Sequence, residues 1–188
     1  MDSTAWDHRY AASDLVWSAT PNVVVARETA DLPPGRALDL ASGEGRNAIW
    51  LAERGWRVTA VDFSAVATER ARSLAEQRLG SRADRVDAVT ADLMVWSPEP
   101  ASADLVVLAY LQLGAAERRH AHRLAAVALA RGGTFLLVAH HSDNLREGVG
   151  GPQDSAVLFT EGDVIADLEG TDLVVDRAER VERVVPVE

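Results

Sequence analysis

The sequence predicts an α/β fold in which helices alternate with the strands of a mainly parallel sheet. Short β-rich apolar runs alternate with helical patterns, glycines mark the turns, and 188 residues suit one hydrophobic core. Such alternation implies βαβ units with right-handed crossovers. We therefore expect a single domain over residues 1–188, with a helical segment over 1–35 and an α/β core over 36–188.

The first half of the core is expected to contain three strands and two helices. They are predicted from apolar periodicity and from the residues that cap helices. In chain order they are a strand ending near Leu40, a helix over 47–54 closed by Gly55, a strand over 56–61, a helix capped by Ser64 and running to about Leu79, and a strand over 86–90.

The second half continues the alternation and ends in a β-rich segment. A continuous apolar run predicts a buried parallel strand, and the pattern Thr-x-x-Asp is a variant of the capping box. The expected elements are a strand over 103–109, a helix over 116–131, a strand over 134–139, a glycine-rich loop over 147–152, a helix from Thr160 to about Gly170, and a β-rich segment over 173–185.

Composition excludes several chemistries. The chain has no cysteine, which removes disulfides, thiolate metal sites and a cysteine nucleophile, and all 19 basic residues are arginine, which removes Schiff-base chemistry. The net charge of -10 disfavours a nucleic-acid partner. No apolar run approaches the about 18 residues of a membrane span, and the N-terminus lacks a signal-peptide core, so we expect a cytoplasmic protein without a membrane partner.

One stretch points to a ligand. A short apolar strand ends in a carboxylate, Asp39, the chain then turns through Gly43 and Gly45, and a second strand ends in Asp62, seventeen positions after Gly45. Strand, glycine loop, helix, strand and acid is the arrangement that holds an adenine nucleoside, because glycines permit close approach and the acid binds ribose hydroxyls.

Two adenosine cofactors compete for this loop. The spacing Gly43-x-Gly45-x-x-Ala48 satisfies the dinucleotide fingerprint in its G/A form, which on its own is a weak signal. A dinucleotide loop binds a pyrophosphate on backbone N–H groups, a site that favours anions. Asp39 and Glu44 bring two carboxylates into the turn. They favour a ligand with an ammonium and a sulfonium, such as S-adenosylmethionine.

The pattern Asp39-x-x-x-Gly43-x-Gly45 resembles the first motif of class I S-adenosylmethionine-dependent methyltransferases. The run 38–52, with Val61-Asp62-Phe63-Ser64, is similar to small bacterial methyltransferases of the tellurite-resistance and thiopurine type. The resemblance covers about residues 6–185. It implies a Rossmann-like, doubly wound, three-layer α/β/α fold, S-adenosyl-L-methionine as cofactor and S-adenosyl-L-homocysteine as product.

The resemblance also raises a question about the end of the sheet. The family's sheet usually finishes with a seventh, antiparallel strand, and this sequence stops at 186–188, where that strand is expected. Either the strand is missing, or residues 173–185 are arranged differently. An open edge favours pairing with another chain, so the expected state is a monomer or a homodimer.

The resemblance assigns roles around the loop. Asp39 would face the cofactor's ammonium; alternatively, it caps the turn. Asp62 would bind the ribose hydroxyls; alternatively, it caps the following helix. Phe63 would lie against the adenine ring; alternatively, it is an aromatic residue of the core. Asp92 would accept from the adenine amino group, and Leu93 would donate its backbone N–H. The full set of implied cofactor-binding positions is Asp39, Ala41, Ser42, Gly43, Glu44, Gly45, Asn47, Asp62, Phe63, Ser64, Asp92, Leu93, Ala109, Tyr110, Leu111 and Trp17.

The acceptor is expected to be a small molecule. Methyltransferases of nucleic-acid amino groups often carry an acid or amide, two prolines and an aromatic after strand four, whereas this chain has Ala109-Tyr110-Leu111-Gln112. The aromatic N-terminal segment resembles the family's leading helix and lid, in which Arg9 can bind an anionic acceptor or the cofactor carboxylate.

No catalytic residue and no metal site is identified from the sequence. His140 and His141 follow the fifth strand and can accept a proton; the candidates are therefore His140, His141, Tyr110 and Arg9. The predicted function is methyl transfer from S-adenosylmethionine to a sulfur, selenium, tellurium, oxygen or nitrogen atom of a small molecule (EC 2.1.1.-). The alternatives are an NAD(P)-dependent Rossmann oxidoreductase and a non-catalytic S-adenosylmethionine-binding domain.

Overall fold

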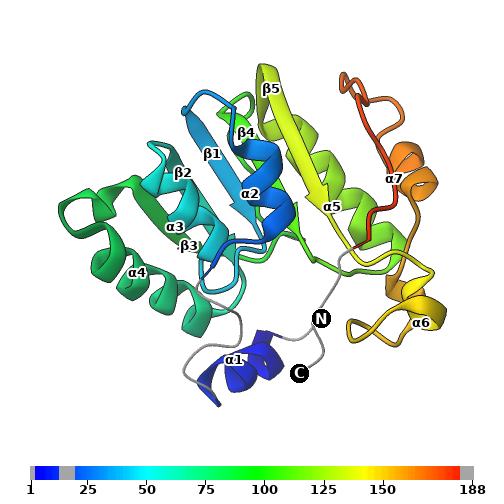
Figure 1. The fold of residues 1–188 in the computed structure, drawn as a ribbon, viewed down its shortest axis with the longest axis horizontal. Coiled ribbons are helices and arrows are strands. Elements are labelled where there is room, and N and C mark those ends of the chain that lie inside the picture. Colours follow the sequence, from blue (N-terminus) through cyan, green and yellow to red (C-terminus); the bar gives the residue numbers. More distant parts are fainter. Residues whose placement is uncertain (1–2, 13–19, 183–188) are drawn as a thin grey trace. The chain divides into compact units, whose positions relative to one another are not determined.

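The structure is a computed structural model that describes residues 3–12 and 20–182. These residues belong to two compact units. The sheet unit comprises residues 1–111 and 127–139, and the second unit comprises 112–126 and 140–188. Figure 1 shows the elements of each unit. The expectation of a single domain stays a prediction.

The sheet unit is built on five parallel strands, which confirms the α/β class predicted from the sequence. The strands run in the order β3-β2-β1-β4-β5, and every pair of neighbours is parallel. Their bounds are β1 (Arg36–Leu40), β2 (Arg57–Asp62), β3 (Val86–Thr90), β4 (Ala103–Ala109) and β5 (Leu129–Val138).

Helix α4 of the sheet unit begins and ends at the capping residues that the sequence predicts. Ser64 accepts a hydrogen bond from the backbone N–H of Ala67 at the start of α4, and Gly80 caps its end. The elements are α1 (Ser3–Ala11), α2 (Val23–Thr29), α3 (Arg46–Glu53), α4 (Ala65–Leu79) and the 3-10 helix η1 (Gly80–Arg85).

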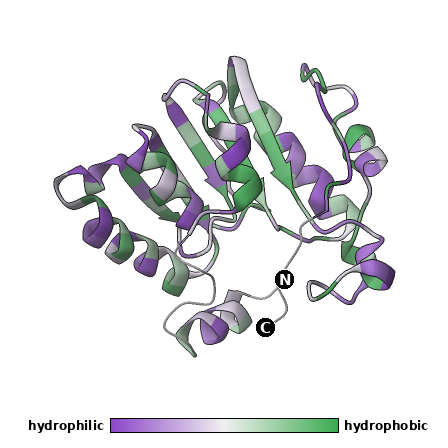
Figure 2. Ribbon diagram, viewed as in Figure 1, coloured by the Kyte–Doolittle hydropathy of each residue, from purple (hydrophilic) through white to green (hydrophobic). Residues whose placement is uncertain are grey.

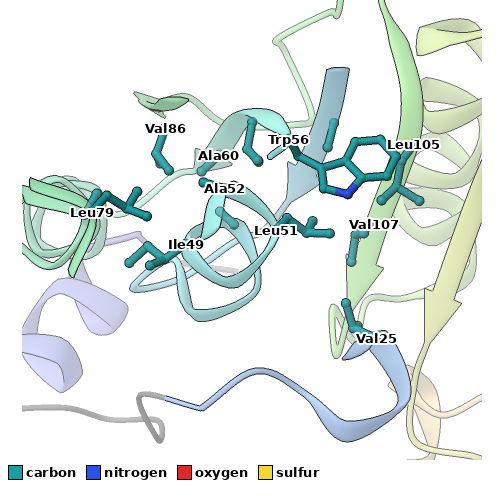
Figure 3. Packing of buried hydrophobic residues seen from close by; sticks show 14 of the residues in the cluster. Val25, Ile49, Leu51, Ala52, Trp56, Ala60, Leu79, Val86, Leu105 and Val107 are labelled. Atoms are coloured by element: carbon teal, nitrogen blue, oxygen red, sulfur yellow. The ribbon is translucent and has the colours of Figure 1, made fainter. Parts of the chain in front are cut away.

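The core of the sheet unit is apolar and closely packed. Figure 3 shows Val25 of α2 and Leu51 of α3 on the side of the sheet where Leu105 and Val107 of β4 point. Figure 2 shows mainly hydrophobic strands beside helices that mix both kinds of residue. Four successive residues of β4, Leu105 to Leu108, are at most 1% exposed, so both faces of this strand are covered.

The second unit contains α5 (Ala115–Ala128) up to residue 126, α6 (Asn144–Glu147), the 3-10 helix η2 (Ser155–Val157) and α7 (Glu161–Asp167). The predicted capping box is present: the Thr160 hydroxyl accepts from the backbone N–H of Asp163, and the Asp163 carboxylate accepts from that of Thr160. The fully buried Asp167 carboxylate accepts from Arg118 at 2.6 Å and from Arg119 at 3.2 Å. These ion pairs join α7 to α5.

The predicted boundary between the helix over 116–131 and the next strand is wrong. The helix ends at Ala128, and β5 begins at Leu129 instead of Thr134. Leu129 pairs with Ala103, and the register then shifts so that Thr134 pairs with Leu105. Residues 129–131 have good helix propensity, but pairing with β4 across an irregular turn overrides it.

The predicted β-rich segment over 173–185 forms no strand in its described part, residues 173–182. Arg180 instead pairs with Asp143 at 2.7 Å and with Glu147 of α6 at 2.6 Å. Val174 is 84% exposed. Valine-rich sequence becomes a strand only where it pairs with a sheet, so its propensity is not enough here. The described residues therefore contain a five-stranded sheet without an antiparallel strand.

We predict that Gly45→Ala lowers the free energy of unfolding by about 2–4 kcal/mol, because φ is +79° and the added Cβ would lie 2.9 Å from the Ala71 Cβ. Gly132→Ala is the matched control: φ is +80°, but nothing lies within 4 Å of its added Cβ. It should cost about 1 kcal/mol. Urea unfolding measures both, and equal losses would show that contact with α4 contributes nothing.

Candidate functional site

The carboxyl ends of β1, β2 and β4 meet at one edge of the sheet. β1 is the first strand of the sheet, yet it lies between β2 and β4, so the chain changes direction across the sheet at this point (Figure 1). Ligands of open α/β sheets bind outside the carboxyl ends of the strands at such a switch point. We call this edge, formed by residues 39–47, 62–64, 92–93 and 109–111, the switch-point rim.

The loop after β1 makes a tight turn through left-handed backbone conformations. Ala41, Gly43 and Gly45 have φ of 54°, 55° and 79°. The backbone N–H of Ser42 donates to the Val61 carbonyl at 3.0 Å, which fastens the loop to β2. The chain then enters α3 directly.

Two residues other than glycine have strained backbones at this rim. Ala41 follows β1, and Tyr110, with φ of 63°, follows β4, the neighbouring strand. A left-handed conformation costs a side-chain-bearing residue about 1–3 kcal/mol and is concentrated at functional sites. Sequence reasoning did not detect this strain, because alanine and tyrosine carry no signal for it.

Asp39 lies within β1 and is 1% exposed. Its Oδ2 has no hydrogen-bond partner among the described residues, and neither does the buried hydroxyl of Ser42. Burial raises the pKa of Asp39 to about 7, against the attraction of Arg46 and a hydrogen bond from the Ala48 backbone. Asp62 adds a further upward effect on this pKa. A buried acid with an unused oxygen is suited to a cationic ligand group.

Asp62 ends β2 and holds two turns together. Its Oδ2 accepts from the Gly43 backbone N–H at 2.8 Å, and its Oδ1 accepts from the Ser64 backbone N–H at 2.9 Å. Burial raises the pKa of Asp62, and these hydrogen bonds oppose the rise. The residue that caps α4 is Ser64, so a helix cap is not the main role of Asp62.

Glu44 is 3% exposed and pairs with Arg70 of α4 at 2.8 Å. Arg70 balances the charge of Glu44, so Asp39 and Asp62 would repel a pyrophosphate ligand more than Glu44 would. Arg70 was not identified from the sequence, because 26 positions separate it from Glu44 and only the packing of α4 joins them.

The other predicted rim residues differ in how open they are. Asn47 is buried, and its Oδ1 accepts from the Asn22 backbone N–H at 2.9 Å. Phe63 is half-buried. Asp92 is exposed and accepts from the backbone N–H of Met94, while Leu93 is buried. The half-buried residues after β4 are Ala109, Tyr110 and Leu111.

The candidates for catalysis do not all lie in the sheet unit. His140 and His141 belong to the second unit, where the His141 ring lies 3.2 Å from Asp143 and 3.3 Å from Glu161. Arg9 of α1 lies over the ring of Trp6 at 4.9 Å. Trp17 is outside the described residues. In the part of the chain that is described, no group of three or more His, Asp or Glu side chains could hold a metal ion.

No described helix combines the length and the apolar character needed to cross a membrane.

Several solved structures share this fold. The glycopeptide N-methyltransferase MtfA complexed with S-adenosylmethionine has a TM-score of 0.59 at 22% identity, over 72% of this chain and 55% of its own. An S-adenosylmethionine-dependent methyltransferase from Geobacter sulfurreducens, in complex with S-adenosylhomocysteine, has 0.57 at 24% identity, over 68% and 52%. Geranyl diphosphate methyltransferase in complex with sinefungin has 0.64 at 16% identity, over 82% and 58%.

The chain thus spans little more than half the length of these three proteins. At these identities the likeness shows the fold. No curated protein matches the sequence.

The family is shown by a sequence model described as a methyltransferase domain, which matches residues 37–133. The match is just over half of the 188 residues and runs from β1 into β5, so it includes the glycine loop, Asp39 and Asp62. The chain belongs to this methyltransferase domain family.

Proposed function

We propose that the protein transfers a methyl group from S-adenosylmethionine to a small-molecule acceptor. The observation that carries the proposal is the Asp39 carboxylate, buried beside the glycine loop with one oxygen unpartnered among the described residues. A cationic ammonium is the ligand group that satisfies such an oxygen, because a buried acid without a partner is costly. Pyrophosphate, in contrast, would be repelled by it.

The other rim residues fit the same ligand. Asp62 accepts backbone hydrogen bonds from Gly43, Ser64 and Phe63, and a carboxylate has about four acceptor sites, so one remains for a ribose hydroxyl. Gly43 has no side chain to obstruct the approach of a ligand to the loop. At Gly45 the missing side chain instead makes room for Ala71 of α4. Phe63, next to Asp62, is only half-buried and can contact an adenine face.

The fold's relatives support this choice of cofactor. The matched structures include proteins complexed with S-adenosylmethionine, S-adenosylhomocysteine or sinefungin. Together with the methyltransferase family, they favour methyl transfer over the alternative of an NAD(P)-dependent oxidoreductase. The finer resemblance to tellurite-resistance and thiopurine enzymes stays a prediction.

In the proposed mechanism the residues of the chain act mainly by positioning the cofactor and the acceptor. The cofactor supplies an electrophilic methyl group on a sulfonium. Asp39 would hold the ammonium and Asp62 the ribose, which lie on either side of the sulfonium, so these two residues would position the methyl group at the switch-point rim. Correct placement of two reactants supplies much of the rate enhancement for such a displacement. A soft or already anionic acceptor needs no further base, which agrees with a rim that carries no histidine among its residues.

Charge favours a small acceptor. The net charge of -10 opposes binding to the phosphates of a nucleic acid. Two of the matched structures are named for a glycopeptide and for geranyl diphosphate, which are both smaller than a polynucleotide. The acceptor atom is tested with a panel of thiols, amines, phenols and oxyanions of selenium and tellurium. Cofactor binding without turnover on any of them would favour a non-catalytic domain.

Asp62→Ala should raise the Kd for S-adenosylhomocysteine about 100-fold, because the hydrogen bonding of ribose to a charged group is lost and the Gly43 and Ser64 N–H groups lose the acceptor that positions their turns. Calorimetric titration measures this, with NAD⁺ titrated in parallel. Asp87→Ala is the matched control, because Asp87 is an exposed acid of β3 outside the rim. Binding of NAD⁺ alone to the wild type would reject the methyltransferase proposal.

Cofactor affinity should depend on pH through Asp39. Its pKa is about 7 in the ligand-free protein, so the carboxyl is mostly protonated below pH 7 and must ionise to bind an ammonium. We expect the Kd for S-adenosylhomocysteine to be constant above about pH 8 and to rise up to about tenfold per unit below pH 7. Asp39→Asn should bind weakly and lose this dependence; a wild-type Kd that is flat from pH 5.5 to 8 would contradict the assignment.

Asp39→Asn should weaken ligand binding but increase the stability of the ligand-free protein. The folded-state pKa of Asp39 is raised above its ordinary value of 3.8, so the contribution of Asp39 to stability is complete below about pH 4 and is lost as pH rises through 7. Asp39→Asn removes the buried charge. At pH 8 we expect its free energy of unfolding, measured with urea, to exceed that of the wild type by about 1–4 kcal/mol. The difference should shrink at pH 5. A variant less stable than the wild type at pH 8 would show that the Asp39 charge is well compensated.

A further inference from the structure

We propose that Asp7 is a positioning residue for cofactor binding: it docks α1 onto the ribose-binding end of the switch-point rim and couples this docking to occupation of Asp62. The inference rests on the proposed function, because it takes Asp62 as the ribose-binding acid. It concerns α1, which lies outside the matched residues 37–133.

A polar contact attaches α1 to the start of α4. The Ser64 hydroxyl donates a hydrogen bond to Asp7 Oδ1, and the Val66 backbone N–H lies 3.4 Å from the same oxygen. Helices α1 and α4 are packed together, and Figure 1 shows α1 beyond the carboxyl ends of β1 and β2. A carboxylate at this position also benefits from the positive end of the α4 dipole.

Hydrogen bonds continue from Asp7 to the glycine loop. Ser64, which binds Asp7 through its hydroxyl, donates its backbone N–H to Asp62 at 2.9 Å. Asp62 accepts at 2.8 Å from Gly43. Ser64 is fully buried and Asp62 is 5% exposed, so these groups are shielded from water and their geometry is well defined. The network therefore connects α1, α4, β2 and the loop.

The sign of the coupling follows from the hydrogen bonds. Asp7 and Asp62 are both acids, and the Asp7 carboxylate contributes to the raised pKa of Asp62, so charge repulsion opposes docking. The hydrogen bonds of Ser64 act against this repulsion, because a docked Asp7 fixes Ser64, and Ser64 holds the Asp62 carboxylate where ribose hydroxyls would donate to it. Docking of α1 should therefore be stronger when the cofactor is bound. Because coupling between two binding equilibria is reciprocal, a docked α1 should also strengthen cofactor binding.

Aromatic residues of α1 contact one another. The rings of Trp6 and Tyr10 are 5.6 Å apart, and Arg9 lies over Trp6. The contact of Asp7 reaches beyond the helix, because a single intervening residue, Ser64, connects it to the ribose-binding acid.

Hydrogen–deuterium exchange of the segment 3–11, with and without S-adenosylhomocysteine, tests the proposal together with calorimetric Kd values. In the wild type the ligand should slow exchange of α1. In Asp7→Ala exchange should be fast with or without ligand, and the Kd should rise about fivefold. Asp7→Asn keeps an oxygen that can accept from Ser64, so it should restore ligand-dependent protection. His8→Ala, an exposed position of the same helix, is the control for helix propensity.

The outcomes separate the two proposals. An unchanged Kd and unchanged ligand-dependent protection of α1 in Asp7→Ala would overturn the role of Asp7. Ligand binding without any change in α1 exchange in the wild type would also overturn the coupling. A wild type that does not bind S-adenosylhomocysteine would reject the proposed function and the coupling with it. Equal losses in Asp7→Ala and His8→Ala would assign the effect to helix stability and overturn the specific role of Asp7.

Discussion

The arrangement of the site depends on one buried carboxylate, that of Asp62. By accepting hydrogen bonds from Gly43 and Ser64, it joins the glycine loop after β1 to the start of α4. The two backbone N–H groups come from different turns, so a single side chain at the end of β2 sets how far apart those turns lie. Everything proposed for the ribose end of the cofactor, including the role of Asp7, depends on this position.

Asp62 stabilises the arrangement of the site, whereas the buried charge of Asp39 destabilises the folded protein. Its carboxylate is buried with an unused oxygen, and burial raises its pKa to about 7, so ionisation in the folded protein is unfavourable without a ligand. A ligand ammonium would recover that free energy as binding affinity. Natural proteins keep such destabilising groups where function requires them. The backbone strain at Ala41 and Tyr110 lies at the same rim and adds to its cost.

The loop carries less negative charge than its two acids, Asp39 and Glu44, would give if both were ionised and unpaired. Asp39 and Glu44 both lie in the turn, but Glu44 is neutralised by Arg70 and Asp39 is partly protonated near pH 7. The selective part of the site is therefore the pair Asp39 and Asp62. In the proposed complex these two would contact different parts of the cofactor, the ammonium and the ribose, and neither carboxylate suits a phosphate.

The sequence alone determined the strand order along the chain, the glycine loop, the caps at Ser64 and Gly80 and the acids of the rim, because these are local patterns. It was wrong where long-range pairing decides: Leu129–Arg131 became strand by pairing with β4, and residues 173–182 formed no strand despite their valines. The contacts of Arg70 with Glu44 and of Asp7 with Ser64 join residues 26 and 57 positions apart. Only the tertiary structure decides such pairs, because they arise from how α1 and α4 pack and not from the sequence near either residue.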